Sequence, residues 1–212
     1  MQISLETERL LLRPFTGTDA NNLFNLDSDP DVMRYVNGGN PTPLEVVRNE
    51  ELPWFIEYGQ RHEGYGFWAA IEKSTGEFVG WFLLRPPSDG SPDEPELGYR
   101  LRRSAWGKGY ATEGSRALVR SAFARPGVPR VIAFAHADNT ASRRVMEKVG
   151  MVLVRTFYLT WADRFDGAAQ EAVEYALTRA EWQQQEASPP TLEVNSKAQQ
   201  RTPQVTSQGI NL

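Results

Sequence analysis

The sequence has 212 residues, of which 40% are hydrophobic and 11% are aromatic, and this composition is typical of one globular domain with a sizeable core. Its formal net charge of −4 argues against non-specific binding of nucleic acid, which requires a basic surface. The absence of cysteine excludes disulfides, zinc thiolate sites and cysteine nucleophiles.

From the sequence we expect neither a secretory signal peptide at the N-terminus nor a membrane-spanning helix. No basic region followed by an apolar stretch opens the sequence, and no run of about 18 apolar residues occurs in it. We therefore expect a cytoplasmic protein that does not bind a membrane. Residues 187–212 are rich in Pro, Ser, Thr and Gln and have no helical or alternating period. The sequence predicts a folded domain over residues 1–186 and a disordered tail over residues 187–212.

The first part of the chain predicts one strand followed by helices. Leu5–Phe15 has an apolar strand pattern. A short helix through Leu26 and a second one over residues 32–36 follow it. Leu44–Tyr58 has helical spacing, which Pro53 should kink or restart.

The second part of the chain alternates strands with two helices. Strands are predicted over residues 65–71, 78–84, 96–103, 131–135, 152–160 and 172–177. One helix is predicted to follow the glycine loop at residues 106–109 and to run through residue 123, and another to span residues 139–149. The first two of these strands are expected to form a hairpin, and residues 86–95 an exposed loop. This order of elements predicts an α/β domain with a mixed sheet.

Positive charge gathers in the middle of an otherwise acidic chain. Between Gly98 and Gly150 there are eleven Lys and Arg residues against three Asp and Glu residues, a local net charge of +8. Such a segment favours a compact polyanionic ligand, although solvated helix faces rich in arginine have the same composition.

The segment AWGKGYATEG, residues 105–114, joins a strand to a helix through two glycines. Gly107 and Gly109 lack the Cβ atoms that would keep a ligand from the backbone, and the first amides of a helix have no partner within it. Such amides and the helix dipole bind phosphate, and Lys108 adds a charge. The spacing of a nucleoside-triphosphate loop and the third glycine of a dinucleotide fingerprint are missing. The pattern predicts phosphate binding, or else a plain glycine turn.

The segment HADNTASRRVMEKVGM, residues 136–151, follows the end of an apolar strand, where ligands of open α/β sheets bind. Asp138 or Asn139 stands at the N-cap position of a helix. Ser142 lies on the same helical face as Met146. A serine there either takes part in chemistry or bonds to a backbone carbonyl one turn back.

These motifs occur together in one known family. WGKGYATEG opening a helix, then an apolar strand and NTASRRVMEKVGM, resemble the GNAT superfamily of N-acetyltransferases. The opening ETERLLLRPFTGTDA and the LGYRL strand are similar to the branch that includes the ribosomal-protein N-terminal alanine acetyltransferases. The resemblance covers residues 5–182. It implies the acyl-CoA N-acyltransferase fold, a central and mostly antiparallel sheet splayed into a V, and acetyl-CoA as co-substrate.

The resemblance also implies a role for each motif. The glycine loop would hold the diphosphate of coenzyme A on backbone amides. The end of the preceding strand would hold the pantetheine arm and offer an amide to the thioester carbonyl. The second helix would contact the pantetheine and the thiol. The implied coenzyme-binding residues are Leu101, Arg102, Arg103, Gly107, Lys108, Gly109, Tyr110, Ala111, Thr112, Asn139, Ser142 and Arg143.

Two positions depart from the family pattern. Ser104 stands where the glycine motif commonly begins with Gln or Arg, which leaves the backbone argument intact. Met146 stands where many members have a tyrosine that protonates the departing thiolate, and methionine has no proton to donate. Ser142 or a bound water is therefore the candidate acid. Glu96 is the candidate base, or else an exposed strand-edge carboxylate, and Glu113 is interpreted as structural.

The sequence thus predicts an enzyme that transfers an acetyl group from acetyl-CoA to a primary amine by direct attack, without a metal. The expected acceptor is a protein N-terminus or a small molecule. An α-amino group with a pKa of about 8 is neutral in roughly a tenth of molecules at pH 7. It therefore depends less on a catalytic base for its deprotonation than a lysine amine does. The alternatives are a regulatory module that binds acyl-CoA without catalysis, and a transferase for small amines or antibiotics. We expect a monomer or a homodimer.

Overall fold

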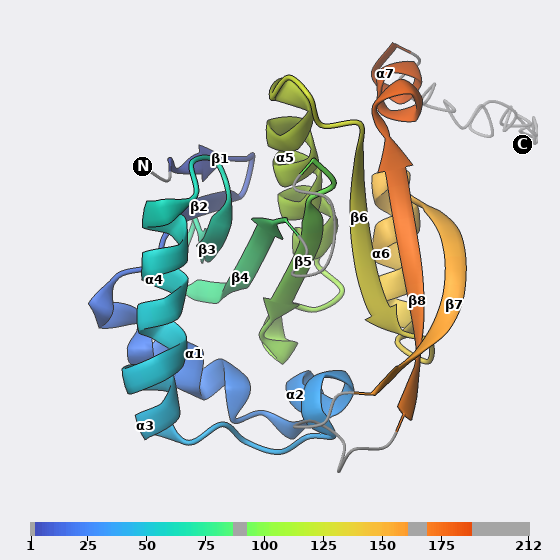
Figure 1. Ribbon diagram of the computed structural model, residues 1–212. Helices are drawn as coiled ribbons and strands as arrows, with labels where there is room; N and C mark the ends of the chain where they lie inside the picture. The colour runs from blue at the N-terminus through green and yellow to red at the C-terminus, as the bar shows by residue number, and fades with distance from the viewer. Residues whose placement is uncertain (1–2, 87–92, 161–168, 188–212) are drawn as a thin grey trace, which may run out of the picture.

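The computed structural model describes residues 3–86, 93–160 and 169–187 of the chain (Figure 1). Within these residues, eight strands form one open sheet in the order β1-β2-β3-β4-β5-β6-β8-β7. The strands are β1 (Leu5–Glu6), β2 (Leu10–Pro14), β3 (Gly66–Glu72), β4 (Phe78–Arg85), β5 (Glu96–Leu101), β6 (Arg130–His136), β7 (Val152–Thr160) and β8 (Ala169–Thr178). All neighbours are antiparallel except β5 and β6. The predicted mixed α/β fold with a mostly antiparallel sheet is confirmed.

Helices cover both faces of this sheet, and Figure 1 shows α5 and α6 behind the strands. Side chains alternate between the faces along each strand, so Phe67 and Trp81 belong to one apolar cluster while Trp68 and Phe82 belong to another. The first cluster packs under the N-terminal helices and the second under α5. The helices are α1 (Ala20–Asp27), α2 (Pro30–Asn37), α3 (Leu44–Val46), α4 (Leu52–Arg61), α5 (Tyr110–Ala124), α6 (Thr140–Val149) and α7 (Arg179–Ala187).

The helix predicted over Leu44–Tyr58 restarts near its proline, as expected. A π-helical turn, Val47–Glu51, separates α3 from α4, and Pro53 lies in the first turn of α4. Proline has no N–H and its ring clashes with a carbonyl one turn back, so the regular bonding pattern shifts there.

Two elements differ from the sequence prediction. The single strand predicted over Leu5–Phe15 is wrong, because the chain turns between β1 and β2, and the Thr7 N–H donates to the Leu10 carbonyl at 2.9 Å. Helix α7 was not predicted, and its polar sequence has little helical periodicity. The structure does not describe residues 188–212, which belong to the predicted tail, or residues 87–92, which make up most of the predicted loop. None of the described helices is long and apolar enough to cross a membrane.

The pairing between β5 and β6 is confined to one end of the strands. The register joins Glu96 to Ile132, and the Ile132 N–H donates to the Pro95 carbonyl at 3.0 Å. After this point the strands separate, and α5 provides the crossover between them. The chain therefore has the splay that the family resemblance implies.

The close packing of α5 on the sheet yields a stability prediction. A Cβ added to Gly114 would lie 2.3 Å from Phe82 Cζ, closer than any real contact. Alanine favours helix by up to about 1 kcal/mol, but the clash should outweigh this and destabilise Gly114→Ala by about 1–3 kcal/mol. Urea unfolding measures the difference, and a variant as stable as the native protein would contradict this packing.

Candidate active site

A cleft of about 760 Å³ lies where β5 and β6 separate. Its lining comes from both faces of the sheet, since α2 and α4 contribute on one side and α5 and α6 on the other. The cleft therefore passes through the sheet between the two strands. An elongated ligand can lie against the start of α5 and reach α4 with its other end.

The backbone of β5 presents polar groups to this cleft. The Arg102 N–H donates to the Val79 carbonyl at 2.9 Å, so the even-numbered residues of β5 turn their main-chain groups toward β4. The odd-numbered residues turn theirs toward β6. Trp106 Nε1 donates to the Leu101 carbonyl at 2.9 Å. The amides of Tyr99 and Leu101 thus face the split, while the Arg102 amide is already bonded to β4.

The glycine loop has the conformation that its sequence requires. Gly107 and Gly109 have φ angles of 73° and 85°, which cost other residues about 1–2 kcal/mol. A Cβ added to Gly107 would meet no described atom within 4 Å, so open space adjoins the loop. The first bond of α5 runs from the Glu113 N–H to the Gly109 carbonyl at 3.0 Å. The amides of residues 110–112 precede this bond and have no acceptor in the helix.

An acid in the first turn of α5 fixes the loop to the turn between β1 and β2. Glu113 accepts hydrogen bonds from Thr7 Oγ1 at 2.6 Å and from the backbone and Nε of Arg9 at 2.8 and 2.7 Å. Arg9 Nη1 also donates to the Lys108 carbonyl at 2.9 Å. Burial raises the pKa of the Glu113 carboxyl, but the hydrogen bonds outweigh burial and leave its pKa below the ordinary value. These contacts agree with the structural interpretation of Glu113.

The residues implied by the family resemblance separate into two groups. The buried phenol of Tyr110 bonds to Glu72 at the end of β3 and so anchors the loop to the sheet. The implied residues that line the cleft are Glu96, Leu101, Gly107, Gly109, Tyr110, Ala111, Thr112, Asn139 and Ser142.

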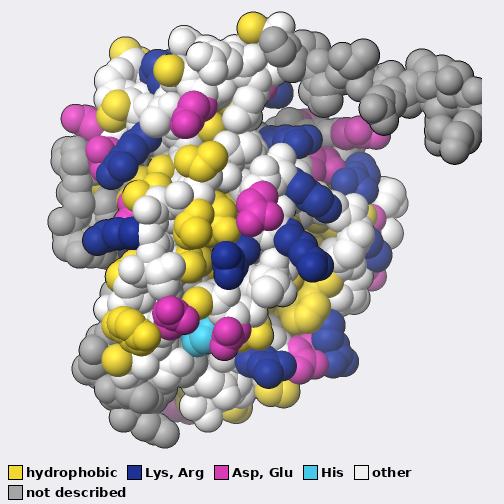
Figure 2. All heavy atoms as spheres, turned by 90° about the vertical axis from the view of Figure 1, so that its right-hand side faces the viewer, with side chains coloured by type: hydrophobic (Ala, Val, Ile, Leu, Met, Phe, Trp, Pro, Cys, Tyr) yellow, Lys and Arg dark blue, Asp and Glu magenta, His cyan; other side chains and the backbone are white. Residues whose placement is uncertain are grey.

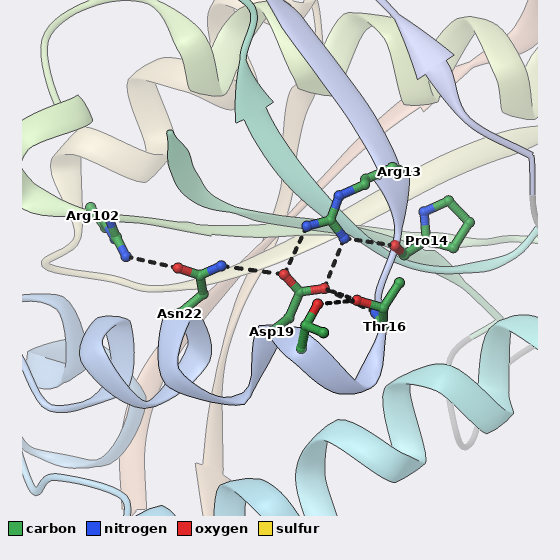
Figure 3. A network of polar contacts seen from close by, with 7 residues as sticks. Arg13, Pro14, Thr16, Asp19, Asn22 and Arg102 are labelled. Atoms are coloured by element: carbon green, nitrogen blue, oxygen red, sulfur yellow. Dashed lines mark hydrogen bonds and ion pairs between the residues drawn. The ribbon is translucent and has the colours of Figure 1, made fainter. Parts of the chain in front are cut away.

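The other implied residues lie outside the cleft lining. Groups distant in the sequence hold Arg102 and Arg103 away from it. Figure 3 shows Arg102 pointing to Asn22, whose Oδ1 lies 3.4 Å away, and Asn22 in turn contacts Asp19. Arg103 pairs with Asp31.

The two remaining residues of this group are Lys108 and Arg143. The Lys108 carbonyl accepts from Arg9, as described above. Arg143 donates to the Tyr175 hydroxyl at 3.3 Å and to the Ala137 carbonyl at 3.1 Å.

The candidate base lies on the α4 side of the sheet. Glu96 Oε2 is 3.3 Å from Arg85 Nη2, and the Arg85 guanidinium lies 5.9 Å from the centre of the Trp54 ring. The positive charge beside Glu96 stabilises an ionised carboxylate, the form that a base must have. The aromatic side chains of Trp54 and Trp81 also line the cleft.

The candidate acid lies on the α5 and α6 side. Asn139 caps α6 by accepting the Ser142 N–H at 3.1 Å. The Ser142 hydroxyl is 3.0 Å from the Tyr99 hydroxyl, which comes from the middle of β5. Burial raises the pKa of Tyr99 to about 12, although the bond with Ser142 partly offsets this effect. Tyr99 was not predicted as a site residue, because only the fold brings β5 and α6 together.

Three other polar residues of the cleft were not predicted as site residues. Arg144 and Lys148 line it from successive turns of α6, a spacing that could have revealed them. Ser115 lines it from α5 and is fully buried, and its Oγ has no hydrogen-bond partner in the described part of the chain. A buried hydroxyl without a partner is costly, so this atom suits a polar ligand in the cleft.

The positive charge of the middle segment is partly taken up by ion pairs. Arg100 lies 2.6 Å from the buried carboxylate of Asp27. On the face that carries β7 and β8, Figure 2 shows Lys and Arg side chains interspersed with Asp and Glu. No group of three or more His, Asp or Glu side chains in the described ranges could hold a metal.

The fold and the cleft define a class of protein. A strand pair that opens into a cleft, beside a helix whose free amides adjoin a glycine loop, can hold a long ligand with a diphosphate at one end. Comparison with known proteins agrees. The family model described as an acetyltransferase (GNAT) domain matches residues 9–152.

Relatives and solved structures support the same assignment. The chain is 36% identical over 188 residues to the FsC-acetyl coenzyme A-N(2)-transacetylase of Aspergillus fumigatus, covering 85% of this chain and 78% of that protein. An acetyltransferase of the GNAT family from Bacillus anthracis is 26% identical, with a TM-score of 0.68 over 83% of this chain and 98% of its own. RimL, a ribosomal alpha-N-protein acetyltransferase in complex with coenzyme A, has the same fold, with 20% identity and a TM-score of 0.68 over 83% of this chain and 98% of its own.

The chain therefore belongs to the GNAT family. It is an acetyl-CoA-dependent N-acetyltransferase, as its sequence motifs predict.

The hydrogen bonds at Glu113 predict a pH-dependent contribution to stability. Because the pKa of this carboxyl is lower in the folded chain than its ordinary value of 4.5, its contribution is present above about pH 4.5 and is lost as the pH falls through the lowered value. We expect Glu113→Gln to lower the free energy of unfolding by about 1–2 kcal/mol at pH 7. This difference should shrink on acidification below pH 4.

Urea unfolding at several pH values measures this effect. Glu57→Gln is the matched control, because Glu57 pairs with Arg61 on an exposed surface of α4, and it should change stability by less than about 0.5 kcal/mol. A constant difference between Glu113→Gln and the native protein from pH 7 to pH 3 would contradict the assigned ionisation.

Proposed function

We propose that this enzyme acetylates the primary amine of a small molecule. The observation that carries the proposal is a second pocket of about 500 Å³ beside the acceptor end of the cleft. Both cavities share Val36, Glu51, Trp54 and Arg100, so they adjoin each other between α2 and α4. A pocket of this volume suits a small molecule.

The comparisons support the same class of acceptor. The name of the Aspergillus fumigatus relative states transfer from acetyl coenzyme A to an N(2) nitrogen, and this relative matches 85% of the chain at 36% identity. RimL acts on a ribosomal protein, but at 20% identity it supports the fold alone.

The coenzyme is proposed to lie along the cleft, with its diphosphate at the amides of residues 107–112. Its pantetheine arm would bond to the Tyr99 and Leu101 amides as an added strand would. Arg144 and Lys148 supply positive charge on the α6 side of the cleft. Acetyl-CoA supplies an acetyl group that is activated as a thioester. The buried Ser115 hydroxyl and the open space at Gly107 are the features that suit this ligand.

The acceptor is proposed to enter from the opposite face, between α2 and α4. Glu96 would take a proton from the attacking nitrogen, either directly or through water. Ser142 would lie beside the sulfur on the other face of the sheet. The amide of Leu101 or Tyr99 would hold the carbonyl oxygen, where negative charge develops. A cytoplasmic location and a folded domain ending at residue 186 remain predictions.

The open space at Gly107 allows a matched test of coenzyme binding. Gly107 and Gly127 have φ angles of 73° and 86°, and a Cβ on either would meet no described atom within 4 Å. Alanine at each position should lower the stability by a similar amount, about 1–2 kcal/mol. Only Gly107→Ala places a methyl group where the diphosphate is expected, and it should weaken coenzyme A binding about tenfold or more.

Calorimetric titration with coenzyme A measures this difference, with Gly127→Ala as the control. Equal affinities of the two folded variants would contradict the proposed position of the diphosphate.

A second test addresses the acceptor. Thiol release from acetyl-CoA is measured with a panel of small primary amines and with peptides of matched α-amino pKa. The size of the acceptor pocket predicts a kcat/KM at least about tenfold higher for the best small amine than for the best peptide. Turnover of peptides alone would overturn the proposal in favour of a protein N-terminus. Coenzyme binding without any thiol release would favour a sensor.

A further inference from the structure

The Tyr99 phenol joins the middle of β5 to the first turn of α6 by a side-chain hydrogen bond. Its hydroxyl lies 3.0 Å from Ser142 Oγ and 3.4 Å from the Ser142 carbonyl oxygen. The phenol ring packs against Phe82, with ring centres 5.9 Å apart. Both hydroxyls belong to residues that line the cleft. The strand and the ring packing therefore fix the position of Tyr99, and its hydroxyl forms a hydrogen bond with Ser142 on α6.

We infer that Tyr99 is a positioning residue that directs the Ser142 hydroxyl toward the sulfur of the bound thioester. The inference rests on the proposed function, in which that sulfur lies beside Ser142. When Tyr99 donates to Ser142 Oγ, it occupies one acceptor site of the serine and leaves the serine proton free to point into the cleft. Without this bond, a serine in the first turns of a helix commonly turns to a backbone carbonyl.

The methionine near Ser142 on the same helix cannot replace its hydroxyl as a hydrogen-bond donor. Met146 lines the cleft one turn beyond Ser142 and is almost fully buried. A thioether has no proton, so it gives a developing thiolate no hydrogen bond. The Ser142 hydroxyl can supply that bond if its orientation is fixed.

The charge state of Tyr99 suits a donor that keeps its proton. Its pKa of about 12 lies more than three units above that of an ordinary thiol, about 8.5. Tyr99 is therefore neutral over the ordinary assay range and can donate a hydrogen bond to Ser142.

The acetyl transfer requires no proton from Tyr99. As the amine nitrogen bonds to the acetyl carbon, the carbon–sulfur bond breaks and its electron pair stays on sulfur. The nitrogen gives its proton to Glu96 or to water. Ser142 stabilises the thiolate by donating a hydrogen bond and keeps its own proton, and the thiolate later takes a proton from solvent.

Tyr99→Phe tests the inference, because it removes one oxygen atom and keeps the packed ring. We expect kcat to fall about tenfold, the value of one neutral hydrogen bond, with KM for acetyl-CoA changed less than twofold. Ser142→Ala should lower kcat at least as much. The double variant should be no slower than Ser142→Ala, because both changes remove the same hydrogen bond to sulfur.

Tyr175→Phe is the matched control. Tyr175 is a buried tyrosine whose hydroxyl also bonds to α6, donating to Glu147 at 3.0 Å, but it does not line the cleft. Its loss should reduce stability while leaving kcat within about twofold of the native value. A fall in kcat equal to that of Tyr99→Phe would show that loosening α6 suffices, and it would overturn the inference.

A readout that does not depend on turnover is the pKa of the thiol of bound coenzyme A, followed by the ultraviolet absorbance of its thiolate. A hydrogen bond from Ser142 stabilises the thiolate, so this pKa should rise by about one unit in Tyr99→Phe, with no further rise in the double variant. An unchanged thiol pKa in the folded variant would overturn the inference. If the native enzyme neither binds coenzyme A nor releases thiol, the proposed function fails with it. If the native enzyme releases thiol and Tyr99→Phe has the native kcat and thiol pKa, the inference about Tyr99 is wrong but the proposed function stands.

Discussion

The short pairing between β5 and β6 is the constraint on which the rest of the molecule depends. Two parallel strands that meet only at Glu96 and Ile132 leave the later amides of β5 without a strand partner. Buried amides without partners are costly, so the gap is tolerated because it borders a cleft that a ligand or water can fill. The sheet stays intact on both sides, since β4 pairs with all of β5 and β8 pairs with all of β6.

The elements beside the cleft place different chemical groups at its two ends. At one end, positive φ angles at Gly107 and Gly109 turn helix amides toward open space, and the Arg9–Glu113 contacts hold that turn in place. At the other end, strand alternation sends Glu96 to the α4 face and Tyr99 to the α6 face. A base and a hydroxyl can therefore act on one thioester from opposite faces of the sheet.

Local patterns in the sequence were sufficient to predict most elements of this fold. The hairpin of β3 and β4, the glycine loop and the helix from Asn139 to Gly150 follow from alternation, glycine conformation and capping. The turn between β1 and β2 was not predicted, because Thr7 and Arg9 form it without glycine or proline. The positions of Arg102 and Arg103 outside the cleft were also beyond prediction, since their partners lie more than 70 residues away in the sequence. Tyr99 stands in the LGYRL motif, but its contact with Ser142 depends on tertiary structure.

Amide hydrogen exchange with and without coenzyme A tests the central claim most directly, because it reports on the backbone groups that are proposed to bind the ligand. Saturating coenzyme A should slow exchange over residues 97–102 and 107–112, while exchange in β2 and β3 stays unchanged. Coenzyme binding without protection in either of these two segments would contradict the account.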